Sequence, residues 1–135
     1  MIWEATISTT KIDSKGNEKV QKQSFVLDGY VTFGEVEERL FDEFASESGF
    51  EVCAIRQSRI KEIANGRSNE NDLLWVAELQ DLFTDENGNE KTIKYKILFF
   101  SKTFDTAKAF ISNYAEQGYN LVLVSLKLTK FIDVL

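Results

Sequence analysis

The chain has 135 residues, of which 43% are hydrophobic and 28% are charged, and its net charge is −6. This composition excludes an intrinsically disordered chain, and no apolar run approaches the ~20 residues that a membrane-spanning helix needs. The negative charge argues against a protein that neutralises many nucleic-acid phosphates, although it leaves room for a local basic patch. We therefore expect a single globular domain over residues 1–135.

Two halves of the sequence repeat one another in the same order. Trp3-Glu4-Ala5 is matched by Trp75-Val76-Ala77, and the segment 13–19 is matched by 85–91, both pairs lying 72 residues apart. Matches that keep their order over a whole chain indicate an internal duplication. We place repeat 1 at about 1–63, an exposed linker at 64–72, and repeat 2 at about 73–135.

Each repeat begins with a strand that leads into a hairpin. Apolar residues alternate with polar ones from Trp3 and again from Trp75, which is the pattern of a strand with one buried face. The dipeptides Gly16-Asn17 and Asn87-Gly88 then predict tight turns, because glycine and asparagine tolerate positive φ. A second strand follows each turn.

A helix is predicted next in each repeat. Thr32 and Glu35 have the spacing of a capping box, and apolar residues recur at helical spacing over about 33–47. The same pattern follows Thr103 in repeat 2. Gly49 and Gly118 are expected to end the two helices.

A long third strand closes each repeat, at about 51–63 and 120–134. Strict alternation predicts one buried apolar face in repeat 2, formed by Val122, Val124, Leu126 and Leu128. The aligned residues of repeat 1 are Cys53, Ile55, Gln57 and Arg59, so half of that face is polar. On this pattern the thiol of Cys53, the single cysteine, is expected to be buried and inert, and the absence of a disulfide favours a reducing compartment.

These elements predict an α+β fold. We expect a tandem duplication of a ββαβ unit, with antiparallel sheet, two packed helices and a pseudo-twofold axis between the repeats. Whether the strands form one continuous sheet or two facing sheets is open at this level.

The sequence offers little support for catalysis. It has no histidine and no glycine-rich phosphate-binding motif, so we expect a non-enzymatic protein without cofactor or metal. Asp85, Asn87 and Asn89 resemble the start of a calcium loop, but Glu90 stands where that loop requires glycine, and a hairpin turn is favoured. A metal-dependent hydrolase that relies on carboxylates alone is the least favoured reading.

A local basic surface is the clearest candidate binding site. It would be formed by Arg56, Arg59 and Lys61 near the end of the first repeat, joined by Lys94 and Lys96 of the second. Extension of these side chains into water is the simpler explanation of their position. The alternative is a surface that recognises a partner, including single-stranded nucleic acid.

Short motifs along nearly the whole chain carry a family resemblance. They are Trp3 at the start of a strand, Val26-Leu27-Asp28, Thr32 to Arg39, Phe50 to Ile63, Asp85 to Lys91, and Thr129 to Val134. In this pattern the chain resembles an uncharacterised domain-of-unknown-function family of Bacteroidales and their phages. The resemblance implies a bacterial or phage accessory protein and supplies no catalytic residues.

We therefore expect a binding protein as the function. Another protein, or a second copy in a homodimer, is the expected partner, because the chain is acidic and a sheet offers a flat face or an edge strand for docking. A single-strand nucleic-acid binder is the alternative. The first residues, Met1 to Ala5, lack a basic region followed by an apolar one, so we expect a cytoplasmic location without membrane attachment.

Overall fold

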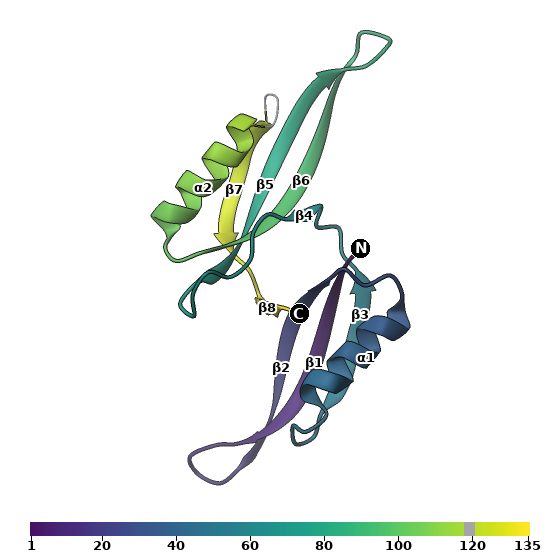
Figure 1. Cartoon of the computed structure of the whole chain (residues 1–135), viewed down its shortest axis with the longest axis vertical. Helices are drawn as coiled ribbons and strands as arrows, with labels where there is room; N and C mark the ends of the chain where they lie inside the picture. The colour runs from purple at the N-terminus through teal and green to yellow at the C-terminus, as the bar shows by residue number, and fades with distance from the viewer. Residues whose placement is uncertain (118–120) are drawn as a thin grey trace. The chain divides into compact units, whose positions relative to one another are not determined.

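The computed structural model describes residues 1–117 and 121–135, which form two similar series of elements (Figure 1). The first series is β1 (Ile2–Ile12), β2 (Glu18–Asp28), α1 (Phe33–Phe44), β3 (Glu51–Gln57) and β4 (Glu62–Ile63). The second is β5 (Leu73–Thr84), β6 (Glu90–Ser101), α2 (Phe104–Gln117), β7 (Leu121–Leu128) and β8 (Phe131–Val134). The α+β prediction is confirmed, and the repeated order agrees with a duplication.

The strands form two sheets rather than one. One sheet has the order β3-β1-β2-β8 and the other has the order β4-β6-β5-β7. The three longer strands of each sheet pair antiparallel, as predicted, whereas β8 pairs with β2 and β4 pairs with β6 in parallel. Each sheet is therefore mixed, with its fourth strand short.

The chain divides into two compact units that do not coincide with the two repeats. Unit 1 comprises Met1–Ser58 and Lys130–Leu135, and unit 2 comprises Arg59–Thr129. The last segment of each repeat therefore supplies the fourth strand of the sheet that the other repeat builds. The single domain over residues 1–135 and the pseudo-twofold axis stay predictions.

This exchange interrupts both predicted third strands. The strand expected over 51–63 ends at Gln57, and the one expected over 120–134 ends at Leu128 before β8 begins. At the two breaks, Ser58 N donates to Ile2 O at 2.9 Å and Thr129 N donates to Leu74 O at 3.1 Å. The prediction of two continuous strands was wrong because the chain passes from one unit to the other at these points.

The predicted linker 64–72 is more ordered than its polar sequence indicated. The Asn65 side chain accepts from Phe100 N at 2.7 Å and donates to Phe100 O at 3.0 Å. The buried carboxylate of Asp72 accepts from the backbone N–H groups of Ser68 and Asn69. These bonds fix the segment on unit 2, although most of its residues are exposed as predicted.

Both hairpin turns have one design. The carboxylate of Asp13 accepts from the backbone of Lys15 and Asn17, and that of Asp85 accepts from Asn87 and Asn89, all at 2.8–2.9 Å. Gly16 and Gly88 both have φ of 79°. Aspartate side chains that bond their own turn backbone explain these sequences without a calcium ion.

The helices begin as predicted. Thr32 and Glu35 form the capping box, with the Thr32 hydroxyl accepting from Glu35 N at 3.2 Å. Thr103 and Thr106 make a similar set of bonds at the start of α2. However, α1 ends at Phe44 rather than near residue 47. Gly118 lies outside the described residues.

Gly49, which has φ of 66°, is expected to be the least replaceable turn glycine. A Cβ atom there would overlap the Thr10 hydroxyl and lie 3.0 Å from Thr10 Cβ, and the second of these atoms cannot rotate away. Gly16 has a similar φ but open space around its Cα atom. We expect Gly49→Ala to lower the free energy of unfolding by about 2–3 kcal/mol and Gly16→Ala by about 1 kcal/mol. Chemical denaturation of both variants checks this, and equal losses would contradict the role of Thr10.

Each unit has its own apolar core beneath its helix. Trp3 and Trp75 occupy equivalent places in the two cores, and their indole N–H groups donate at 2.9 Å to Tyr30 O and Ser101 O. Leu40 and Ile111 are equivalent, fully buried residues of the two helices above them. Among the described residues, no helix is long and apolar enough to cross a membrane.

Candidate protein-interaction surface

The two edge strands β3 and β7 share an irregularity that decides which side chains they expose. The pairing of β1 with β3 shifts register between Thr6 and Ile7, and that of β5 with β7 shifts between Glu78 and Leu79. Each shift leaves one extra residue on the edge strand, Cys53 on β3 and Val124 on β7. This is a β-bulge, and it changes the phase of the side chains on either side of it.

The predicted buried face is wrong at Val122, Val124 and Leu128, and the bulge accounts for the first two of these. Leu123 and Leu126 of β7 pack against the core, whereas Val122, Val124 and Leu128 are 49%, 47% and 53% exposed. On β3 the residues that pack inward are Val52 and Ile55. Cys53 is exposed, so the prediction of a buried thiol was also wrong. Strict alternation placed Val122, Val124 and Cys53 on the buried face, because the sequence gives no sign of a bulge.

The same positions on β3 carry different chemistry. Aligned on the bulge, Val122, Val124 and Leu128 of β7 correspond to Glu51, Cys53 and Gln57 of β3. The inward positions are apolar in both strands. The repeats therefore differ at the edge positions that face solvent, where all three side chains are aliphatic in unit 2 and two of the three are polar in unit 1. We call Val122, Val124 and Leu128 the β7 edge.

The β7 edge presents apolar groups on both sides of its sheet. Val122 lies opposite Gln80, on the face turned away from the α2 core, because Leu79 faces that core. Leu128 lies opposite Trp75, on the helix-facing side. Within the residues that the structure describes, β7 has a sheet neighbour only in β5. Its backbone is thus placed to pair with a further strand.

Charge, proline and a β-bulge are the usual protections of such an edge, and of these β7 has the bulge. The chain has no proline, and Lys127 is the single charged residue on β7. On β3, by contrast, Glu51 and Arg56 both provide charge. The comparison of β3 with β7 was the one signal in the sequence that could have identified this surface.

The predicted basic surface is divided by the fold. Arg56 belongs to unit 1, whereas Arg59, Lys61, Lys94 and Lys96 belong to unit 2. Lys94 and Lys96 lie opposite Gln80 and Glu78, on the face away from the helix. The Lys61 ammonium lies 3.6 Å from the ring centre of Tyr95, which is on the helix-facing side. The structure thus brings Lys94 and Lys96 to one face and places Lys61 on the other.

Arg56 is engaged within its own unit. Its guanidinium donates to Glu4 at 3.0 Å, and the Ser58 hydroxyl donates to the other Glu4 oxygen at 2.7 Å. Partial burial by itself raises the pKa of Glu4, but the hydrogen bonds from Ser58 and Arg56 outweigh it and lower that pKa. Arg56 therefore has a local structural role. A partner-binding role for these five basic residues stays a prediction.

Carboxylates are not gathered in a way that suits a metal ion. Over residues 1–117 and 121–135, no group of three or more Cys, Asp or Glu side chains is placed to hold one. The prediction of a non-enzymatic protein is not tested by this arrangement.

One comparison with known proteins finds a match. The model of the family described as Domain of unknown function (DUF4494) matches residues 1–135. Neither the curated proteins nor the solved structures contain a significant match.

Proposed function

The chain belongs to the DUF4494 family, a domain of unknown function, and we propose from its geometry that it is a non-enzymatic protein-interaction module. Its ligand is an extended segment of another protein, which adds to the second sheet along β7. The observation that carries this proposal is the apolar β7 edge, set against Glu51, Cys53 and Gln57 at the same positions of β3. An origin in Bacteroidales or their phages, and a cytoplasmic location, belong to the same proposal.

Strand addition suits this edge for two reasons. The unpaired backbone groups of an edge strand supply affinity without regard to sequence, and pockets or patches for alternate side chains supply specificity. Val122 and Leu128, on opposite faces, would each contact a different set of the ligand's side chains. We therefore expect a ligand strand with apolar residues on both faces and few charges.

Nucleic acid is the less favoured ligand. The net charge is −6, Arg56 is paired with Glu4, and the remaining basic residues lie on two faces of unit 2. Nucleic-acid binding would require a continuous positive surface and would weaken strongly with salt. An affinity for peptides through β7 should change little between low and moderate salt.

Replacing Val124 tests the proposal. Random linear peptides would be selected for binding to the immobilised protein, and we expect the selected peptides to bind Val124→Lys about tenfold or more weakly, because a lysine on an edge strand opposes pairing. Cys53→Lys, at the bulge position of β3, is the matched control and should bind like the unaltered protein. Peptides that bind both variants equally well would exclude β7 as the docking edge.

A second copy of the chain is the other possible occupant of the edge. If copies pair through β7, sedimentation should show a dimer that forms with rising concentration and that Val124→Lys dissociates while Cys53→Lys does not. A dimer that is insensitive to Val124→Lys would place self-association elsewhere.

A further inference from the structure

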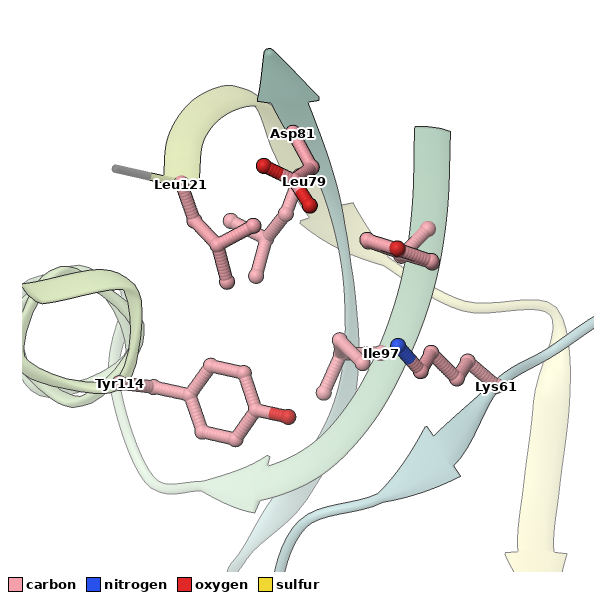
Figure 2. Close-up of a pocket in the computed structure, with 7 residues that line it drawn as sticks. Lys61, Leu79, Asp81, Ile97, Tyr114 and Leu121 are labelled. Carbon is pink, nitrogen blue, oxygen red and sulfur yellow. The ribbon is translucent and has the colours of Figure 1, made fainter. Parts of the chain in front are cut away.

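Unit 2 contains a pocket that is independent of the β7 edge. It lies between α2 and the helix-facing side of β5 and β6 and has a volume of about 190 Å³ (Figure 2). Its lining residues are Lys61, Leu79, Asp81, Tyr95, Ile97, Tyr114 and Leu121. A space of this size admits a compound the size of an amino acid, and it is smaller than the usual site for a nucleotide or a drug-sized ligand.

The corresponding place in unit 1 is filled by aromatic rings. Phe44 lies 4.9 Å from Phe25 and 6.2 Å from Phe50, measured between ring centres. Aligned on the hairpin, the helix and the bulge, these residues correspond to Ile97, Ala115 and Leu121 of unit 2. Protein interiors are normally close-packed. Unit 2 therefore has its opening because smaller side chains replace all three rings.

A carboxylate stands at one side of the pocket. Asp81 continues the inward series of Trp75, Ala77 and Leu79, where unit 1 has the buried Thr9. Figure 2 shows it beside Leu79 and Leu121. Among the described residues, Asp81 forms no hydrogen bond or ion pair, so its charge is available to a ligand.

A cation stands at another side. The Lys61 ammonium lies over the Tyr95 ring, beside Ile97 and away from Asp81 (Figure 2). Lys61 forms no salt bridge with any residue that the structure describes. Tyr95 pairs with Leu79, two residues before Asp81, and two strand residues span ~6.6 Å. Asp81 and the ring beneath Lys61 thus lie two strand residues apart along β5 and β6, and the apolar side chains of Leu79 and Ile97 line the same pocket.

The remaining polar groups are two phenols, those of Tyr95 on β6 and of Tyr114 on α2. Tyr114 is held by a neighbouring carboxylate. Its hydroxyl donates to Glu62 at 2.6 Å. Burial of the hydroxyl and this bond to a carboxylate raise the pKa of Tyr114 to about 12, so the phenol stays neutral at physiological pH. Tyr114 therefore contributes a wall, and Lys61 and Asp81 are the charged lining residues, neither of which forms an ion pair among the described residues.

We propose that this pocket binds a small zwitterion whose ammonium and carboxylate are joined by a short apolar spacer. The ammonium pairs with Asp81, the carboxylate pairs with Lys61, and the spacer lies on Leu79, Ile97 and Leu121. An α-amino acid, in which the two charges are adjacent, fits this separation less well than an ω-amino acid of similar size.

The test uses 6-aminohexanoic acid as the probe, with hexylamine and hexanoic acid as compounds that lack one of its charges. Methyl NMR signals of Leu79, Ile97 and Leu121 should shift on titration, and the zwitterion should bind about tenfold or more tightly than either control. Asp81→Asn should weaken the zwitterion and hexylamine but not hexanoic acid. Lys61→Gln should weaken the zwitterion and hexanoic acid but not hexylamine.

A third variant tests the opening itself. Leu121→Phe introduces a ring where unit 1 has Phe50. It should abolish the probe-induced shifts of the Leu79 and Ile97 methyl signals, while the backbone NMR spectrum remains that of a folded protein. The proposal is overturned if the probe moves no methyl signal at millimolar concentration, or if all three compounds bind equally well.

Discussion

A chain truncated after Thr129 is expected to lose about 4 kcal/mol or more of the stability of unit 1. The missing residues include β8, which pairs with β2 through Ser24 and Val26. Leu135 packs against the core of unit 1, and its backbone N–H donates to Val26 O at 2.7 Å. Val26 itself is fully buried. Burial of a side chain the size of Leu135 contributes up to about 1.5–3 kcal/mol, and each backbone hydrogen bond of β8 and Leu135 adds about 0.5–1.5 kcal/mol.

Denaturant unfolding followed by Trp3 fluorescence measures this loss, in a Trp75→Phe background. Ile132→Ser is the control, because that side chain lies on β8 but is half exposed, and it should change the stability by less than about 1 kcal/mol. If the truncated chain unfolds at the midpoint of the full chain, β8 does not contribute to unit 1.

The sequence was sufficient for the local elements because their signals are local. The Asp13 and Asp85 turns, the Thr32 capping box and the alternation after Trp3 each depend on residues close in the chain. Because of the duplication, each pattern occurs twice in the sequence, and the two occurrences predict the same element. This is why the α+β class could be predicted. Helix ends were less accurate: α1 stops at Phe44, and Glu47 N then donates to Phe44 O at 2.9 Å in the turn that leads to Gly49.

The exchange of the short strands β4 and β8 could not be predicted from the sequence, for a different reason. Whether residues 62–63 pair with β2 or with β6 depends on contacts far apart in the chain, which local periodicity does not report. Ile63 pairs with Leu98 of the following repeat, although repetition alone assigns it to the first. The polar composition of the segment 64–72 likewise hid the pairing of Asn65 with Phe100.

The candidate surface was missed because one inserted residue reverses a strand's faces. Val122 and Val124 are in phase with Leu126 in the sequence, but the bulge places them outside the core. The predicted basic residues lie in two short segments of the sequence, 56–61 and 94–96. Strand alternation nevertheless sends Lys96 and the ring beneath Lys61 to opposite faces of the sheet. Periodicity identifies strands more reliably than it identifies what they expose.

The division of the chain predicts that a mutation that destabilises unit 2 also destabilises unit 1. A mutation that destabilises unit 1 should have a smaller effect on unit 2. Unit 2 is one continuous segment, Arg59–Thr129, whereas unit 1 needs β8 from beyond it. When unit 2 unfolds, its segment becomes a long loop that must be closed to keep β8 on β2, and the entropy of closing such a loop is about 4 kcal/mol. Unit 1 can unfold without this consequence for unit 2.

Two core variants test this asymmetry, with Trp3 reporting on unit 1 in a Trp75→Phe background and Trp75 reporting on unit 2 in a Trp3→Phe background. Leu40→Ala and Ile111→Ala remove equivalent, fully buried helix side chains, and each should cost its own unit about 2–5 kcal/mol. We expect Ile111→Ala to lower the unfolding midpoint at both reporters and Leu40→Ala to lower it mainly at Trp3. Equal shifts at both reporters for both variants would instead show one cooperative domain over residues 1–135, because neither unit would then unfold without the other.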